Sequence, residues 1–244
     1  MLSILKKRWK TGVITPHGRA LGPVVPAAAR GRLVQAQGEV ALAAGEACPT
    51  GALAAEGRSM ALDHGRCILC GNCLQPSGGA LRFSPESLPA FAQREDCRAW
   101  APPGAATEGK AGGSLQIRLV DAGSCNACEQ ELAALSGPAY DFQRFGLDVV
   151  ASPRHADVLL VTGPMTRMMR EALGRTWEAV PAPKVVLAAG TCAVSGGIFR
   201  SSYATLDGLE EWAGGPIIWL PGCPPRPQAI LQALLACREK LRES

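Results

Sequence analysis

Four cysteines in the C-terminal half of this 244-residue chain have the residue type and spacing of a metal site. Cys125 and Cys128 lie in the segment Ser-Cys-Asn-Ala-Cys-Glu. Cys192 lies in Gly-Thr-Cys-Ala, and Cys223 lies in Pro-Gly-Cys-Pro-Pro. Four thiolates that meet at one place can hold a [4Fe-4S] cluster, in which cysteine sulfurs bind the iron atoms. The predicted chemistry is therefore electron transfer.

Each cysteine group follows an apolar, β-branched run, and these runs alternate with helical patterns beyond residue 115. The predicted strands are 115–120, 147–150, 157–162, 184–189 and 216–220. The predicted helices are 127–136, 165–179, 206–213 and 225–242. This alternation predicts an α/β domain over 115–244, a flavodoxin-like open parallel sheet with helices on both faces. Loops at the carboxyl ends of such strands converge on one crevice, which would bring the four cysteines together.

A second set of cysteines lies in the N-terminal half. Cys67, Cys70 and Cys73 have the close triple spacing of bacterial ferredoxins, and Cys48 stands upstream in Cys-Pro-Thr-Gly-Ala-Leu. In two-cluster ferredoxins the cysteine before proline ligates the other motif's cluster. The four ferredoxin thiols missing here would have held one cluster, and the four present would hold the other. We therefore predict a small ferredoxin-like α+β domain over 30–92 with a single [4Fe-4S] cluster.

Zinc is the alternative at this second site, because four thiolates also satisfy tetrahedral Zn²⁺. The close triple and the Cys-Pro context favour iron–sulfur. Two further cysteines have no spaced partners. Cys97 is interpreted as an incidental thiol and Cys237 as a small buried residue of the last helix.

Composition excludes several other classes of function. A net charge of +4 with 5% aromatic residues gives no basic, aromatic groove, so nucleic acid is not an expected partner. No secretory signal is recognisable, so the ten cysteines are expected to be metal ligands in a reducing cytoplasm rather than disulfides. No apolar run approaches the roughly 20 residues that span a bilayer.

Two segments are expected to connect or anchor these units. Residues 1–20 form a basic amphipathic segment, which would lie in a membrane interface, pack on a partner protein or fray. Residues 93–114 are rich in proline, glycine and alanine and are predicted to be a linker.

Residues 115–244 resemble the small subunit of membrane-bound [NiFe] hydrogenases of the formate hydrogenlyase type, and the homologous 20 kDa-type subunit of respiratory complex I. The resemblance includes the cysteine motifs and the segments Ser-Pro-Arg-His-Ala-Asp at 152–157, Leu-Leu-Val-Thr-Gly at 159–163 and Ser-Gly-Gly-Ile-Phe at 195–199. The start of the chain, 5–15, resembles the ferredoxin-like subunit of the same complexes. The Cys-x-x-Cys motif favours the hydrogenase branch, because complex I subunits of this type typically have adjacent cysteines there.

The resemblance implies an electron-transfer subunit without catalytic residues of its own. Its partners would be a hydrogenase large subunit or the complex I equivalent, another iron–sulfur subunit and membrane subunits. Its expected location is peripheral, on the cytoplasmic face of the inner membrane. Two alternatives stay open: a component of a complex I-type NADH/quinone oxidoreductase, and a zinc-binding interaction module.

Overall fold

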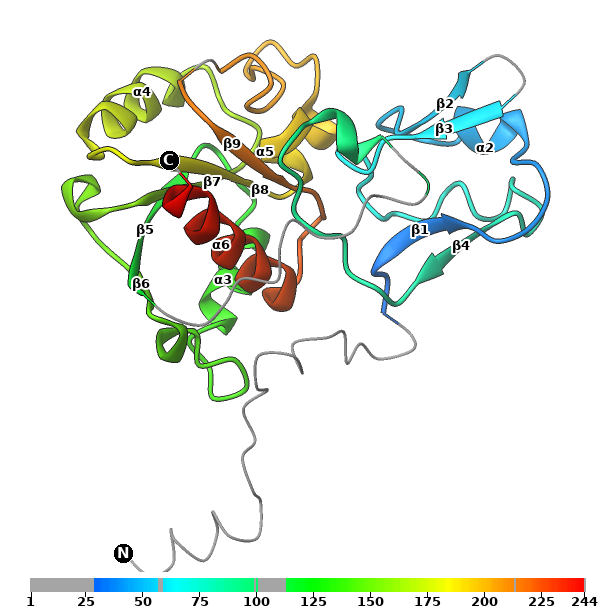
Figure 1. Ribbon diagram of the computed structural model, residues 1–244. Coiled ribbons are helices and arrows are strands. Elements are labelled where there is room, and N and C mark those ends of the chain that lie inside the picture. Colours follow the sequence, from blue (N-terminus) through cyan, green and yellow to red (C-terminus); the bar gives the residue numbers. More distant parts are fainter. Residues whose placement is uncertain (1–28, 57–58, 99, 101–112, 213, 244) are drawn as a thin grey trace, which may run out of the picture.

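A five-stranded parallel sheet organises the C-terminal half of the computed structural model, which describes residues 29–56, 59–98, 100, 113–212 and 214–243 (Figure 1). Its strands are β5 (Leu115–Asp121), β6 (Leu147–Val149), β7 (Val158–Thr162), β8 (Val185–Ala189) and β9 (Ile217–Leu220). They lie in the order β6-β5-β7-β8-β9, and every neighbouring pair is parallel. This is the flavodoxin-like order. The predicted fold class and all five predicted strands are confirmed.

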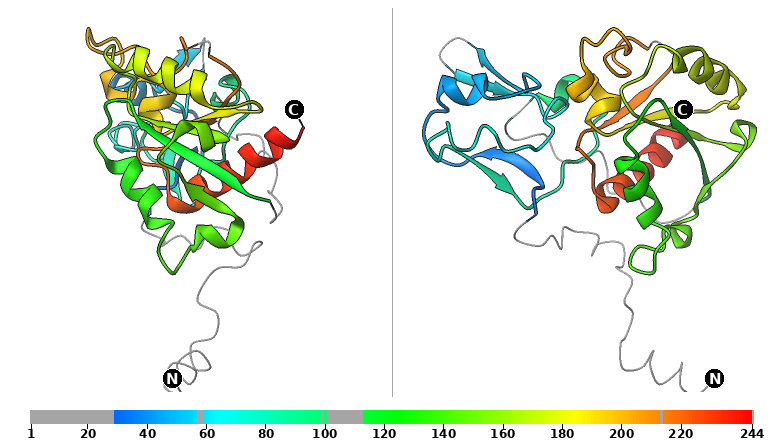
Figure 2. Two further views of the ribbon diagram at one scale, coloured as in Figure 1. Left: turned by 90° about the vertical axis from the view of Figure 1, so that its left-hand side faces the viewer. Right: turned by 180° about the vertical axis from the view of Figure 1, so that it is seen from behind.

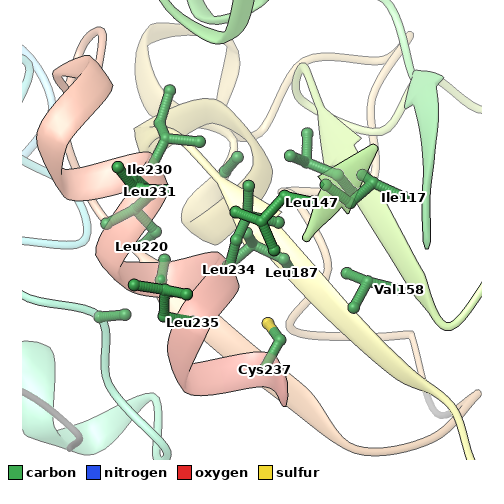
Figure 3. Close-up of a cluster of buried hydrophobic side chains, with 14 of the residues drawn as sticks. Ile117, Leu147, Val158, Leu187, Leu220, Ile230, Leu231, Leu234, Leu235 and Cys237 are labelled. Carbon is green, nitrogen blue, oxygen red and sulfur yellow. The ribbon is translucent and has the colours of Figure 1, made fainter. Parts of the chain in front are cut away.

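Helices cover both faces of this sheet, which explains why its central strands are apolar throughout. All residues of β7 and β8 are buried. One face packs on α3 (Ala127–Ala134) and α6 (Pro227–Arg242), and the other on α4 (Met169–Ala179) and α5 (Thr191–Ser195). Figure 3 shows the first of these interfaces, where Leu187 of the sheet faces Leu234 of α6. Cys237 lies in the same core with no exposed surface, as predicted.

The helix predicted at 206–213 is wrong. Asp207 and Gly208 have φ angles of 55° and 81°, which lie outside the right-handed helical region. The backbone amides also bond to distant segments instead of the preceding turn: Gly208 N donates to Pro164 O at 3.2 Å, and Leu209 N donates to Ala193 O at 2.8 Å. Tertiary partners therefore replace the hydrogen bonds that a helix would have formed.

Two further helix predictions differ in detail. α4 begins at Met169 rather than near 165, because Met165 has a φ of 55° and cannot extend the helix. The five-residue helix α5 was not predicted. It is bounded by Gly190 and Gly196 and is too short to show a helical period.

In the described part of the N-terminal half, one α-helix and two antiparallel strand pairs surround a separate small core. β1 (Arg32–Gln35) pairs with β4 (Leu81–Ser84), and β2 (Leu53–Glu56) pairs with β3 (Ser59–Leu62). The helix α2 spans Leu42–Glu46. This α+β content agrees with the prediction, whereas a relationship to ferredoxins stays a prediction.

The two halves lie side by side and contact each other directly (Figure 2). Phe91 and Trp219 exchange two backbone hydrogen bonds of 2.8 Å beside β9. Within the predicted linker 93–114, residues 95–97 form a 3-10 helix, and Cys97 is fully buried against the C-terminal half. Most of that linker and the basic segment 1–20 lie outside the described residues.

Candidate metal centre

The four C-terminal cysteines lie on loops that follow three strands of the parallel sheet. Cys125 and Cys128 follow β5, Cys192 lies in α5 directly after β8, and Cys223 follows β9. Because the strands are parallel, these loops all leave the same edge of the sheet.

Electrostatic interactions among the four thiols show that they are neighbours. Burial, together with charges on Cys223 and Cys125, raises the pKa of Cys192 to about 11. The pKa of Cys128 is also raised. Burial is the largest cause, the charge of Glu129 is the second, and the charges of the other three cysteines add to it. Because neighbouring thiols raise the pKa values of Cys128, Cys192 and Cys223, a shared cation would favour the thiolate form that metals bind.

Two glycines permit the backbone to approach these sulfurs closely. A Cβ added at Gly190 would lie 2.6 Å from the sulfur of Cys128, and one at Gly197 would lie 3.0 Å from that of Cys192. Their φ angles of 95° and 55° also favour glycine. A residue larger than glycine at either position would therefore displace a candidate ligand.

Hydrogen bonds shape the loop that carries Cys125. The Asp121 carboxylate accepts from Gly123 N at 2.9 Å and from Ser124 N at 2.7 Å. Asn126 takes a left-handed conformation and begins α3. Glu129, in the first turn of α3, accepts a hydrogen bond from the Thr162 hydroxyl at the end of β7. The Cys-x-x-Cys segment is thus fixed at both ends to the sheet.

The four N-terminal cysteines Cys48, Cys67, Cys70 and Cys73 line one cavity. Burial, together with the charges of the other three thiols, raises the pKa of Cys67 to about 12. Burial also raises the pKa of Cys48, but hydrogen bonds outweigh burial and leave that pKa below its usual value. One of these bonds runs from the Ala52 amide to the Cys48 sulfur at 3.2 Å.

An arginine holds the loop of the cysteine triple in place. Arg30 donates to the carbonyls of Leu69 and Cys70 at 3.1 Å and 3.0 Å. Leu69 and Gly71 both have positive φ angles, so the chain turns tightly between the cysteines. Both predicted sets of cysteines are therefore brought together by the fold, while their role as ligands stays a prediction.

Both quartets fit the chemistry of an iron–sulfur cluster, in which each thiolate binds a separate iron atom. The N-terminal set lines an apolar cavity with an amide that donates to sulfur, and the C-terminal set is lined by glycine backbone. Within the described ranges, no three histidine, cysteine, aspartate or glutamate side chains are grouped to bind a single metal ion.

Sequence reasoning missed the side chains that join the two sites. Thr191 and Ser195 of α5 donate hydrogen bonds to the carbonyls of Cys67 and Gly65. Arg94 bonds to residues of both halves. The position of Thr191, next to Cys192 in the motif, was a signal of importance, but its partner lies 124 residues away and spacing alone does not reveal it.

Comparison with known proteins identifies the C-terminal half. Residues 125–237 match the family described as NADH ubiquinone oxidoreductase, 20 kDa subunit. Over 131 residues, the chain is 46% identical to a Pyrococcus furiosus protein named as a probable membrane-bound hydrogenase subunit, covering 53% of this chain and 77% of that protein. The chain belongs to this family. The resemblance predicted from the cysteine motifs is confirmed.

Members of the 20 kDa subunit family similar to this chain come from two kinds of complex. Formate hydrogenlyase subunit 7 of Escherichia coli is 45% identical over 119 residues, which cover 48% of this chain and 46% of that protein. The chain thus spans about half the length of that relative. An NADH-quinone oxidoreductase subunit of Carboxydothermus hydrogenoformans is 43% identical over 117 residues, covering 47% of this chain and 69% of that protein.

Among solved structures, a chain of the membrane-bound sulfane sulfur reductase, an archaeal respiratory membrane complex, aligns with a TM-score of 0.46 and 32% identity. The alignment covers 54% of this chain and 72% of that chain. The family match begins at residue 125, so the ferredoxin-like nature of the N-terminal half stays a prediction. Among the described residues, no helix has the length and apolar character needed to cross a bilayer.

Proposed function

We propose that this chain transfers electrons through two [4Fe-4S] clusters within a membrane-associated, multi-subunit [NiFe] hydrogenase of the formate hydrogenlyase type. The observation that carries the proposal is the meeting of Cys125, Cys128, Cys192 and Cys223 at one edge of the sheet, where the other three cysteines each raise the pKa of Cys128. A [4Fe-4S] cluster bound there would supply one-electron redox chemistry.

The residues of the chain bind, orient and shield each cluster. Thiolates of the two quartets ligate iron, and Gly190 and Gly197 leave room for the sulfurs of Cys128 and Cys192. At the second site, the Ala52 amide donates to the Cys48 sulfur. Such donors stabilise negative charge and raise a cluster's potential. Electrons would then pass between the two halves.

An exposed apolar rim beside the C-terminal cysteines is a candidate binding surface for a partner protein. The rim consists of Met168, Ile198, Phe199 and Tyr203, whose exposed fractions run from 42% to 92%. Hydrogen bonds hold the loops of the rim together. Arg167 N donates to Ala204 O at 2.9 Å, and the Thr205 hydroxyl donates to Phe199 O at 2.8 Å. Exposed apolar patches of this kind mark protein interfaces. We assign the rim to the hydrogenase large subunit, which would carry the catalytic metals.

A complex I-type quinone reductase is the second candidate, because the family also contains NADH-quinone oxidoreductase subunits. The Cys-x-x-Cys spacing of Cys125 and Cys128 favours the hydrogenase. We place the chain on the cytoplasmic face of the inner membrane through its partner subunits, with segment 1–20 as a further contact.

The test is purification of the tagged chain from membranes of its source under anaerobic conditions. The proposal predicts a co-purifying large subunit that contains nickel, and hydrogen-dependent reduction of a viologen dye by the complex. Cys192→Ser should retain the large subunit but reduce electron delivery at least about tenfold. A nickel-free complex that oxidises NADH and reduces quinone would support the second candidate. A colourless chain with bound zinc and no redox partner would contradict both.

A further inference from the structure

The hydroxyl group of Thr191 lies between the two predicted cluster sites. It donates to the carbonyl oxygen of Cys67 at 3.1 Å and accepts from the amide of Gly222 at 3.2 Å. The Thr191 amide in turn donates to Gly222 O at 2.8 Å. Thr191 is 1% exposed, so water does not compete for these bonds. A hydroxyl has one donor and two acceptor positions, and both bonds fit that inventory.

These three bonds connect candidate ligands from both halves of the chain. Cys67 belongs to the N-terminal quartet. Thr191 directly precedes Cys192, and Gly222 directly precedes Cys223, both of the C-terminal quartet. One side chain therefore links the two sites through a single hydrogen bond and adjoining peptide units.

The helix that carries Thr191 is also fixed at its other end to the same N-terminal segment. The fully buried Ser195 donates from its hydroxyl to Gly65 O at 2.7 Å. Two hydroxyls of α5 thus contact the backbone of residues 65–67. Figure 1 shows α5 at the junction of the halves. A buried network in which each member is satisfied holds its groups in one arrangement.

We propose that Thr191 is a positioning residue that sets the electronic contact between the two clusters, an inference that rests on the proposed function. Its hydroxyl holds the peptide of Cys67 against the turn that carries Cys192, so the distance and the bonded path between the sites stay fixed. The transfer moves one electron: the donor site is oxidised, the acceptor site is reduced, no bond forms or breaks, and Thr191 keeps its proton.

The experiment compares two variants. Thr191→Val is isosteric but lacks the hydroxyl, whereas Thr191→Ser keeps the hydroxyl and lacks only the methyl group. Thr176→Val is the matched control, because it removes a hydroxyl of helix α4 whose hydrogen bond to Ala172 O, at 2.7 Å, is exposed to solvent. Each full-length chain is purified anaerobically and its iron is counted. Two readouts follow: the magnetic interaction between the dithionite-reduced clusters by electron paramagnetic resonance, and the rate of electron equilibration between them after flash photoreduction.

Thr191→Val should keep its iron, show a weakened magnetic interaction and equilibrate roughly three- to tenfold more slowly. That factor is the shift in the docked population expected when one buried hydrogen bond is lost. Thr191→Ser and Thr176→Val should behave as the wild type.

Three results would overturn the proposal. The first is a Thr191→Val variant with full iron whose magnetic interaction and equilibration rate are unchanged. The second is a defect in Thr191→Ser as large as that in Thr191→Val. The third is loss of iron from Thr191→Val, which would show that the hydroxyl serves to retain a cluster. A wild-type chain with iron at only one quartet would instead refute the two-cluster function itself.

Discussion

The guanidinium of Arg94 forms two parallel hydrogen bonds with the carboxylate of Asp63, at 3.0 Å and 2.8 Å. Its Nε also donates to Glu210 of the C-terminal half at 2.6 Å. Arg94 is 7% exposed, so this ion-pair network is buried at the junction of the two halves. Burial raises the pKa of Asp63, but the bonds and charge of Arg94 outweigh burial and leave that pKa below its usual value. Arg94 is therefore the main group that favours the charged form of Asp63.

Replacement of Arg94 by methionine is expected to lower the free energy of unfolding by about 3–5 kcal/mol, because it leaves a buried carboxylate without its main partner. Urea denaturation of the anaerobic protein measures the loss. Arg175→Met is the control, since Arg175 pairs with Glu171 on the surface with exposed fractions of 77% and 75%. The control should lose less than about 1 kcal/mol. Equal effects of the two substitutions would show that the junction does not contribute to stability.

Gly190→Ala is expected to remove the C-terminal cluster and spare the N-terminal one. The added Cβ would lie 2.6 Å from the Cys128 sulfur, and the backbone has a φ of 95°. The iron content should fall by about half, from the roughly eight atoms of two [4Fe-4S] clusters. Gly174→Ala is the matched control in α4, where a Cβ meets no atom within 4 Å. The control should retain all iron, and full iron in Gly190→Ala would contradict the assignment of this site.

Reactivity toward an alkylating reagent should distinguish the eight candidate ligands from the two remaining cysteines. With the clusters bound, iodoacetamide is expected to leave the eight candidate ligands unmodified. After oxidative removal of iron, the exposed thiols of Cys70, Cys125 and Cys223 should react first. Cys97 and Cys237 should stay unmodified in both states, because they have no exposed surface. Burial also raises the pKa of the Cys97 thiol to about 12, which keeps it protonated near pH 8.

Mass spectrometry of the digested protein locates each alkylated cysteine. Labelling of Cys125 at the same rate before and after iron removal would show that this thiol is not a ligand.

The apolar rim gives a prediction about assembly. The double substitution Met168→Asp and Tyr203→Asp places charges on two side chains with exposed fractions of 88% and 92%. It should reduce co-purification of the large subunit at least about tenfold, since buried interface side chains of this type contribute about 1–2 kcal/mol or more each. Leu42→Asp, at an exposed apolar position of the N-terminal half, is the control and should have no such effect. An unchanged yield of large subunit in the double variant would exclude the rim as its binding surface.

The sequence was most informative where local pattern and burial coincide. The strands β7, β8 and β9 were predictable because parallel strands covered on both faces are almost continuously apolar. Parallel topology then placed Cys192 and Cys223 at the same edge. Residues 206–213 misled the prediction because their amides bond to Pro164 and Ala193, which local pattern cannot indicate. The contacts of Thr191 and Arg94 were unpredictable for the same reason, since their partners are remote in sequence.

The most direct test is a count of iron, acid-labile sulfide and zinc in the full-length chain purified without oxygen. If each set of four thiolates binds one [4Fe-4S] cluster, the chain should contain about eight iron atoms and eight sulfides, with almost no zinc. Stoichiometric zinc without sulfide, in a protein that shows no spectroscopic change on reduction, would contradict the account.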